Sequence, residues 1–196
     1  NPGNVALELL GTKTGAYAAD LADDYSVFTA ENLAQYDAIL FNNTTRLRFP
    51  DEAMQTAILD FLAAGKGIVG IHAASDNFYD WEEGAEIMGG QFNGHPWNAK
   101  GRWAFQLDDP EHPVNKAFEG EGFWLQDEIY QYRPDTFAGA KKIRILVSLD
   151  MQKDEVTDIL ADGKHREKSL KDYGTEGARQ VPVSWVQEYG GGRVFY

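Results

Sequence analysis

The sequence predicts a single α/β domain built in layers around a mainly parallel central sheet, with β-rich additions in its second half. Two short apolar runs, 37–41 and 67–71, are typical of buried strands. The segment between them repeats apolar residues at helical spacing. A strand, a helix and a second strand joined by short connections favour a right-handed parallel crossover. We therefore expect helices on both faces of a mainly parallel sheet.

The clearest helix is expected between Pro50 and Gly65. Pro50 and Asp51 are typical of a helix start, and Gly65 is typical of the residue that follows a helix end. The apolar positions that recur at helical spacing are Met54, Ile58, Leu59, Phe61 and Leu62. A shorter helix is expected over 81–88, where a pair of glycines ends it.

Further strand-like runs follow in the second half of the chain. They span residues 102–107, 123–132, 143–149, 181–186 and 193–196. Residues 150–180 form a long polar stretch, in which 156–160 favour at most a short helix or strand. Because loops of this length in compact domains tend to be functional lids or mobile segments, we expect such a role here.

Composition excludes several kinds of chemistry. The chain has 196 residues and no cysteine, so it has no disulfide, no thiolate metal site and no cysteine nucleophile. Its formal charge is -13, from 31 acidic and 18 basic residues, which opposes nucleic-acid binding unless the basic residues form a dense patch. The basic residues of 164–171 are better explained as a solvated loop face than as such a patch. No apolar run approaches the roughly 18 residues of a membrane span, so we expect a soluble protein.

His72 is the first candidate catalytic residue. It directly follows the strand 67–71, and the small residues around it are typical of a tight strand-to-helix turn that presents its central side chain. Ligands of open parallel sheets bind outside the carboxyl ends of the strands. We therefore expect His72, with Asp76 in the same loop, to act in catalysis. The alternative is a buried histidine that hydrogen-bonds to the backbone.

His95 lies in a glycine-rich segment, 89–97, and is followed by a proline. Glycines permit close backbone approach, and an imidazole at a rigid turn can ligate a metal or relay a proton. Tryptophans and tyrosines are mostly core residues, but the neighbouring Trp97 is expected to stack on a sugar ring. The alternative is a glycine-rich turn with an incidental histidine.

The pair Asp127 and Glu128 lies within an apolar, aromatic segment. In a strand, alternate residues share a face, so Glu128 is expected beside Tyr130 and Tyr132. A carboxylate among aromatic rings is costly unless it is paired, protonated or metal-bound, which makes Glu128 a candidate base or metal ligand. Asp127, Tyr130 and Tyr132 are candidate substrate-binding residues. The alternative is a buried ion pair of Glu128 with an arginine, either Arg102 or Arg133.

Several motifs, taken in order, resemble the trehalose-utilisation (ThuA-like) family across roughly residues 36–196. They are GIVGIHAA at 67–74, MGGQFNGHP at 88–96, EHP at 111–113, DEIY at 127–130, and PVSWV with GGRVFY within 182–196. The resemblance implies a flavodoxin-like, class I glutamine amidotransferase-like layered fold. In amidotransferases the turn after this strand carries the cysteine nucleophile, whereas here it carries His72, so glutamine hydrolysis through a thioester is excluded.

The resemblance also implies a role in the use of trehalose and related disaccharides, partly through 3-keto sugars, and a sugar oxidoreductase as a possible partner. It implies an extracytoplasmic location, because the similarity is greatest to members that carry export signals. Two departures indicate that residues 1–196 are one domain trimmed at both ends. The first strand of the family is missing, and so is a Gly-His turn after the last strand, which would leave a metal centre one ligand short.

Two functions are therefore open. In the first, His72, His95 and Glu128 hold a divalent metal, Zn, Mn or Fe, in an enzyme that acts on a disaccharide or keto-sugar derivative. In the second, an aromatic and acidic rim binds a saccharide or a partner oxidoreductase without catalysis, and Trp97, Tyr130 and Tyr132 are its stacking platforms.

Overall fold

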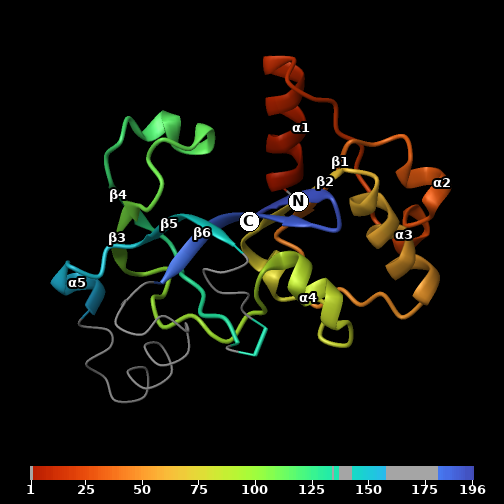
Figure 1. Ribbon diagram of the computed structural model, residues 1–196. Coiled ribbons are helices and arrows are strands. Elements are labelled where there is room, and N and C mark those ends of the chain that lie inside the picture. Colours follow the sequence, from red (N-terminus) through yellow and green to blue (C-terminus); the bar gives the residue numbers. More distant parts are fainter. Residues whose placement is uncertain (1, 134, 137–142, 158–180) are drawn as a thin grey trace.

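The computed structural model describes residues 2–133, 135–136, 143–157 and 181–196 (Figure 1). Within these ranges seven strands form one sheet in the order β1-β2-β7-β6-β5-β3-β4. Their bounds are Ala38–Asn42 for β1, Gly67–Ile71 for β2, Arg102–Leu107 for β3, Phe123–Gln126 for β4, Arg144–Leu149 for β5, Pro182–Tyr189 for β6 and Gly192–Phe195 for β7. The predicted strands are confirmed except at 123–132, where β4 ends at Gln126.

The expectation of a mainly parallel sheet is wrong for the sheet as a whole. The pairs β1–β2 and β2–β7 are parallel, which confirms the predicted crossover, but the remaining adjacent pairs are antiparallel. Short connections can join only antiparallel neighbours. The turn between β6 and β7 is one of these, because Gly190 and Gly191 both have positive φ, at 60° and 101°, as a tight hairpin requires.

The first three described helices precede β1, and the others lie in the connections between strands. They are α1 (Pro2–Thr14), η1 (Tyr25–Val27), α2 (Ala30–Leu33), α3 (Glu52–Ala63), η2 (His72–Ser75), α4 (Glu82–Met88), η3 (Pro113–Phe118) and α5 (Asp154–Thr157). The predicted helix before Gly65 is confirmed as α3, where Asp51 Oδ1 accepts a hydrogen bond from Ala53 N at 2.9 Å. None of the helices in these ranges is long and apolar enough to cross a membrane.

Helices do not cover both faces of the parallel strands as expected. Side chains of α3 and α4 pack into one core with Ile68 of β2 and Val194 of β7, which are paired in register and so share a face. On the opposite face Leu40 of β1 is 41% exposed, and Gly11 is the one buried residue of α1. The covered face therefore carries the main core.

A second core lies under the antiparallel strands. It joins Trp103 and Phe105 of β3 to Leu146 of β5 and to the buried Trp97. For the long stretch 150–180 the sequence predicts a lid or mobile segment, with at most a short helix or strand at 156–160. Its described part contains α5, and residues 158–180 lie outside the described ranges.

Candidate active site

His72 begins η2 directly after β2, as predicted, and it adopts a left-handed backbone conformation with φ of 50°. This conformation costs a non-glycine residue roughly 1–2 kcal/mol, so the surroundings must hold it. Tyr196 OH donates a hydrogen bond to His72 O at 2.5 Å and lies 2.9 Å from Ser75 Oγ. Ala73 N donates to Asn43 Oδ1 at 3.3 Å. The turn is thereby fixed, and the His72 side chain is 35% exposed.

Glu128 lies between the two predicted histidines. Its Oε1 is 3.1 Å from His72 Nε2, and its Oε2 is 3.9 Å from His95 Nδ1. The Glu128 side chain is 28% exposed, which makes this a sheltered cluster at the surface. His72 Nε2 itself is buried and makes no aligned hydrogen bond within the described part of the chain. Buried polar atoms that make no well-aligned hydrogen bond are rare in native proteins, and a functional role is one explanation for them.

Tyr130 closes one side of this cluster. Its ring lies 4.6 Å from the His72 ring and 4.3 Å from the Phe92 ring, measured between centroids. Burial raises the pKa of Tyr130 strongly, and the neighbouring charge of Glu128 raises it further. The phenol therefore stays protonated and acts as a hydrogen-bond donor beside the carboxylate.

The segments that carry Glu128 and His95 are held together by their backbones. Residues 91–97, the second part of the glycine-rich segment 89–97, run antiparallel to 129–133, with isolated bridges at Phe92–Tyr132 and Trp97–Ile129. Gln131 N donates to Gly94 O at 2.8 Å, and Arg133 N donates to Gln91 O at 2.7 Å. This pairing replaces the expected continuation of β4, and it brings His95 opposite Glu128 and Tyr130.

A buried asparagine, which sequence analysis missed, ties together the loops after β1 and β2. Asn77 is 1% exposed, accepts from Leu47 N at 2.7 Å, and donates to Thr44 Oγ1 at 2.8 Å and to Ala74 O at 3.0 Å. Its location just past the His72 turn was the only sequence signal. Polar residues of this type in such loops often satisfy buried backbone groups.

Two predicted stacking platforms are core residues and must be corrected. Trp97 is 0% exposed, and its Nε1 donates to Val156 O at 2.9 Å. Tyr132 is 3% exposed and packs edge-on against Trp185 with ring centroids 5.1 Å apart. Neither ring can stack on a ligand. Tyr132 departs from the face of Glu128 because β4 ends at Gln126, so strand alternation no longer applies beyond it.

The remaining predicted residues lie at the margin of the cluster. Asp127 is exposed, and its Oδ1 accepts from Glu128 N at 2.8 Å, so it shapes the turn before Glu128. Asp76 ends η2, and its carboxylate accepts hydrogen bonds from Tyr79 OH at 2.5 Å and from the Thr45 hydroxyl. The alternative ion pair of Glu128 with Arg133 is not formed, because Arg133 Nη2 pairs with Asp135 Oδ2 at 2.7 Å.

The described residues do not present a ready-made metal cage. In those parts of the chain, no three His, Asp or Glu side chains are grouped so that they could hold a metal ion. His72, His95 and Glu128 nonetheless provide two imidazoles and a carboxylate, a donor set that suits Zn, Mn or Fe.

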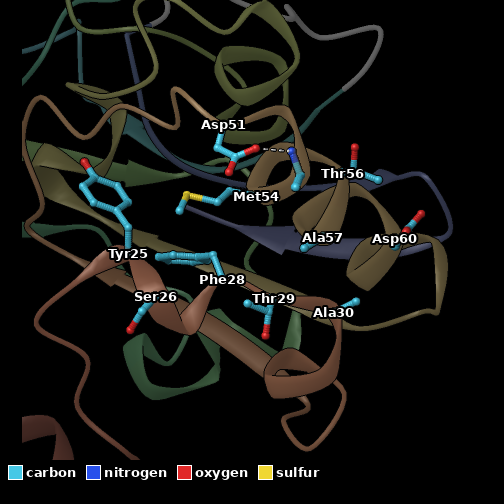
Figure 2. Close-up of a pocket in the computed structure, with 11 residues that line it drawn as sticks. Tyr25, Ser26, Phe28, Thr29, Ala30, Asp51, Met54, Thr56, Ala57 and Asp60 are labelled. Carbon is cyan, nitrogen blue, oxygen red and sulfur yellow. Dashed lines mark hydrogen bonds between the residues drawn. The ribbon is translucent and has the colours of Figure 1, made fainter.

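A groove of about 380 Å³ lies elsewhere, between η1, α2 and α3 (Figure 2). Phe28 and Met54 face it, and the carboxylate of Asp51 caps α3 at its rim. None of the predicted site residues lines this groove. The groove is therefore separate from the His72 cluster.

Comparison with known proteins agrees with this fold. A ThuA-like protein from Bacteroides uniformis has a TM-score of 0.65 at 23% identity, and the match covers 97% of this chain and 72% of that one. A ThuA-like protein from Parabacteroides merdae has a TM-score of 0.64 at 19% identity, covering 98% and 71%. A cytoplasmic protein from Salmonella typhimurium has a TM-score of 0.56 at 13% identity, covering 95% and 72%. At these identities the likeness concerns the fold alone, and no curated protein matches the sequence.

The family model described as trehalose utilisation matches residues 1–196. That match extends over the whole chain and includes the segments that carry His72, His95 and Glu128. It indicates a carbohydrate-related role. The chain belongs to the ThuA, or trehalose-utilisation, family.

Proposed function

We propose that the chain is a carbohydrate-active enzyme in which His72, His95 and Glu128 hold a divalent metal ion beside a disaccharide or keto-sugar substrate. The observation that carries this proposal is the position of Glu128 between His72 Nε2 and His95 Nδ1, at 3.1 Å and 3.9 Å. Two ligand atoms on one tetrahedral ion, each about 2.1 Å from it, lie roughly 3.4 Å apart. The two distances are on either side of this value. The buried His72 Nε2, which makes no aligned hydrogen bond in the described residues, fits a ligand atom.

A metal bound here would polarise a sugar carbonyl or lower the pKa of a bound water. The protein's own groups would do the rest. Tyr130 would donate a hydrogen bond to a substrate oxygen, because its phenol stays protonated. The backbone pairing of 91–97 with 129–133 would keep His95 and Glu128 in place.

A metal-free version has support from one observation. Among the described residues no three ligand-type side chains are arranged for a metal, while His72 and Glu128 are already within ion-pair distance. In this version the imidazole of His72 moves a proton and Glu128 orients the ring. The non-catalytic saccharide-binding module has less support, since Trp97 and Tyr132 are buried. A sugar oxidoreductase partner and export from the cytoplasm remain proposals that rest on the family resemblance.

The test compares four variants with the wild type. They are His72→Ala, His95→Ala, Glu128→Gln and the control His112→Ala, whose Nδ1 accepts from Val114 N at the start of η3. Bound metal is measured by elemental analysis and by titration of Zn²⁺ and Mn²⁺ into chelator-treated protein. We expect the three site variants to lose affinity by more than the roughly 10–100-fold typical of a supporting residue, and the control to be unchanged.

Turnover of trehalose and of its 3-keto derivative is measured on the same samples. If chelator-treated protein turns these sugars over and His72→Ala abolishes that turnover, the metal-free version is supported. Binding of these sugars without turnover in any sample would favour the module. Thermal melting separates loss of function from loss of fold, and His72→Ala should melt close to the wild type because the side chain is partly exposed.

A further inference from the structure

A polar network adjoins the His72 cluster and joins the two loops that follow β1 and β2. Asp76 is its centre, because Tyr79 OH donates to Oδ1 at 2.5 Å and the Thr45 hydroxyl donates to Oδ2. The backbone reinforces the link, since Arg46 N donates to Asp76 O at 2.6 Å. The network is therefore fixed in place.

The network keeps hydrogen-bonding capacity for a ligand. An ionised carboxylate has about four acceptor positions, and the described residues use two of them on Asp76. Partial burial and, to a smaller extent, the hydrogen bond to Asp76 raise the pKa of Tyr79 to about 12, so its phenol stays protonated and keeps donating to Asp76. The Tyr79 residue is 41% exposed, unlike the buried Trp97 and Tyr132. An accessible aromatic ring beside a carboxylate with spare acceptor positions suits a sugar ring, which offers apolar C–H groups and hydroxyl donors.

The network is continuous with the candidate active site. Asp76 ends the short helix that begins at His72. Ser75, the residue before Asp76, accepts a hydrogen bond from Phe92 N at 3.0 Å, and the Phe92 ring packs on the Tyr130 ring with centroids 4.3 Å apart. A ligand that used both places would have to be longer than one sugar ring.

We propose that Asp76, Tyr79 and Thr45 form a second saccharide subsite, in which Tyr79 stacks on the non-reacting ring of a disaccharide and Asp76 accepts hydrogen bonds from its hydroxyls. This inference rests on the proposed function, in that the other ring lies at His72 and Glu128. It makes the substrate class a disaccharide or longer glycoside. It also changes the role of Asp76 from the catalytic role expected from sequence to substrate binding.

The experiment is isothermal titration of trehalose and of glucose into chelator-treated wild type, Tyr79→Ala, Asp76→Asn and Tyr17→Ala. Tyr17 is the matched control, because it is also 41% exposed but contacts α1. Loss of an aromatic contact predicts about a fivefold weaker affinity of Tyr79→Ala for trehalose, and loss of a charged acceptor predicts about tenfold or more for Asp76→Asn. Glucose affinity should change little in either variant, since a single ring can occupy the His72 side.

The proposal is overturned if Tyr79→Ala binds trehalose like the wild type, if trehalose and glucose weaken together, or if the wild type binds no trehalose. The titrations are repeated in a His72→Ala background. A selective loss of trehalose affinity that persists there supports the subsite even when no metal or turnover is found. Failure of the proposed function is thus distinguished from failure of the subsite.

Discussion

The parallel and antiparallel parts of the sheet contribute to the site in different ways. Among the described residues, left-handed backbone at non-glycine positions is concentrated in the loops after β1 and β2, at Asn43, Arg46, His72 and Phe78, with Glu119 as the one other case. Side-chain hydrogen bonds from Asn77 and Tyr196 hold these loops. The antiparallel part instead presents Glu128 and Tyr130 through main-chain pairing of two irregular segments.

This difference shows where each side of the site is sensitive. Strained conformations persist only where the surroundings over-determine them, so the His72 side depends on particular side chains. The Glu128 side depends on backbone bonds that most substitutions leave intact. Mutations of equal cost to stability should therefore have unequal effects on the site.

The largest expected effect is a loss of stability on substitution in the two hydrophobic cores. Trp185→Ala and Trp97→Ala should each lower the free energy of unfolding by about 3–5 kcal/mol, because both side chains are fully buried. Urea denaturation measures this, with tryptophan fluorescence or circular dichroism as the signal. A Trp97→Ala protein of unchanged stability that had lost saccharide affinity would restore the stacking role expected from sequence.

A matched pair of buried asparagines tests the comparison directly. Asn77 and Asn115 are both 1% exposed, and Asn115 Nδ2 donates to Asp109 O at 2.8 Å and Leu146 O at 3.0 Å in the antiparallel part. Alanine at either position should cost about 1–3 kcal/mol through unsatisfied buried groups. Only Asn77→Ala should also weaken metal or saccharide binding in the folded fraction. Equal loss of binding in both variants would mean that the two parts do not differ in this way.

A smaller effect on stability is expected from the titration of Tyr196 in alkaline solution. Burial raises the pKa of Tyr196 to about 12, above the ordinary tyrosine value of about 10. The stabilisation from the protonated phenol is complete below pH ~10 and is lost as pH rises towards 12, by up to about 1.4 kcal/mol per pH unit. Chemical denaturation at pH 9, 10 and 11 should show a shallower alkaline decline for Tyr196→Phe than for the wild type. Identical slopes would show that this phenol does not titrate differently on folding.

Part of the candidate site could be predicted because it depends on local pattern. The strand before His72 is a short apolar run, and a residue that directly follows such a strand lies at its carboxyl end whatever the rest of the chain does. The pairing of Glu128 with two histidines could not be derived in the same way. It requires 91–97 to run beside 129–133, a contact between segments that share no local signal.

The sequence by itself determined the segments: β1, α3 and β2 with their crossover, the turn at His72, and the motifs of the family. These follow from hydrophobic periodicity and turn residues, which act over a few neighbouring positions. Only the tertiary structure decided which aromatic rings face solvent. Trp97 and Tyr132 are buried while Tyr79 is accessible, because burial depends on what distant segments pack against each ring, and composition alone carries no record of those contacts.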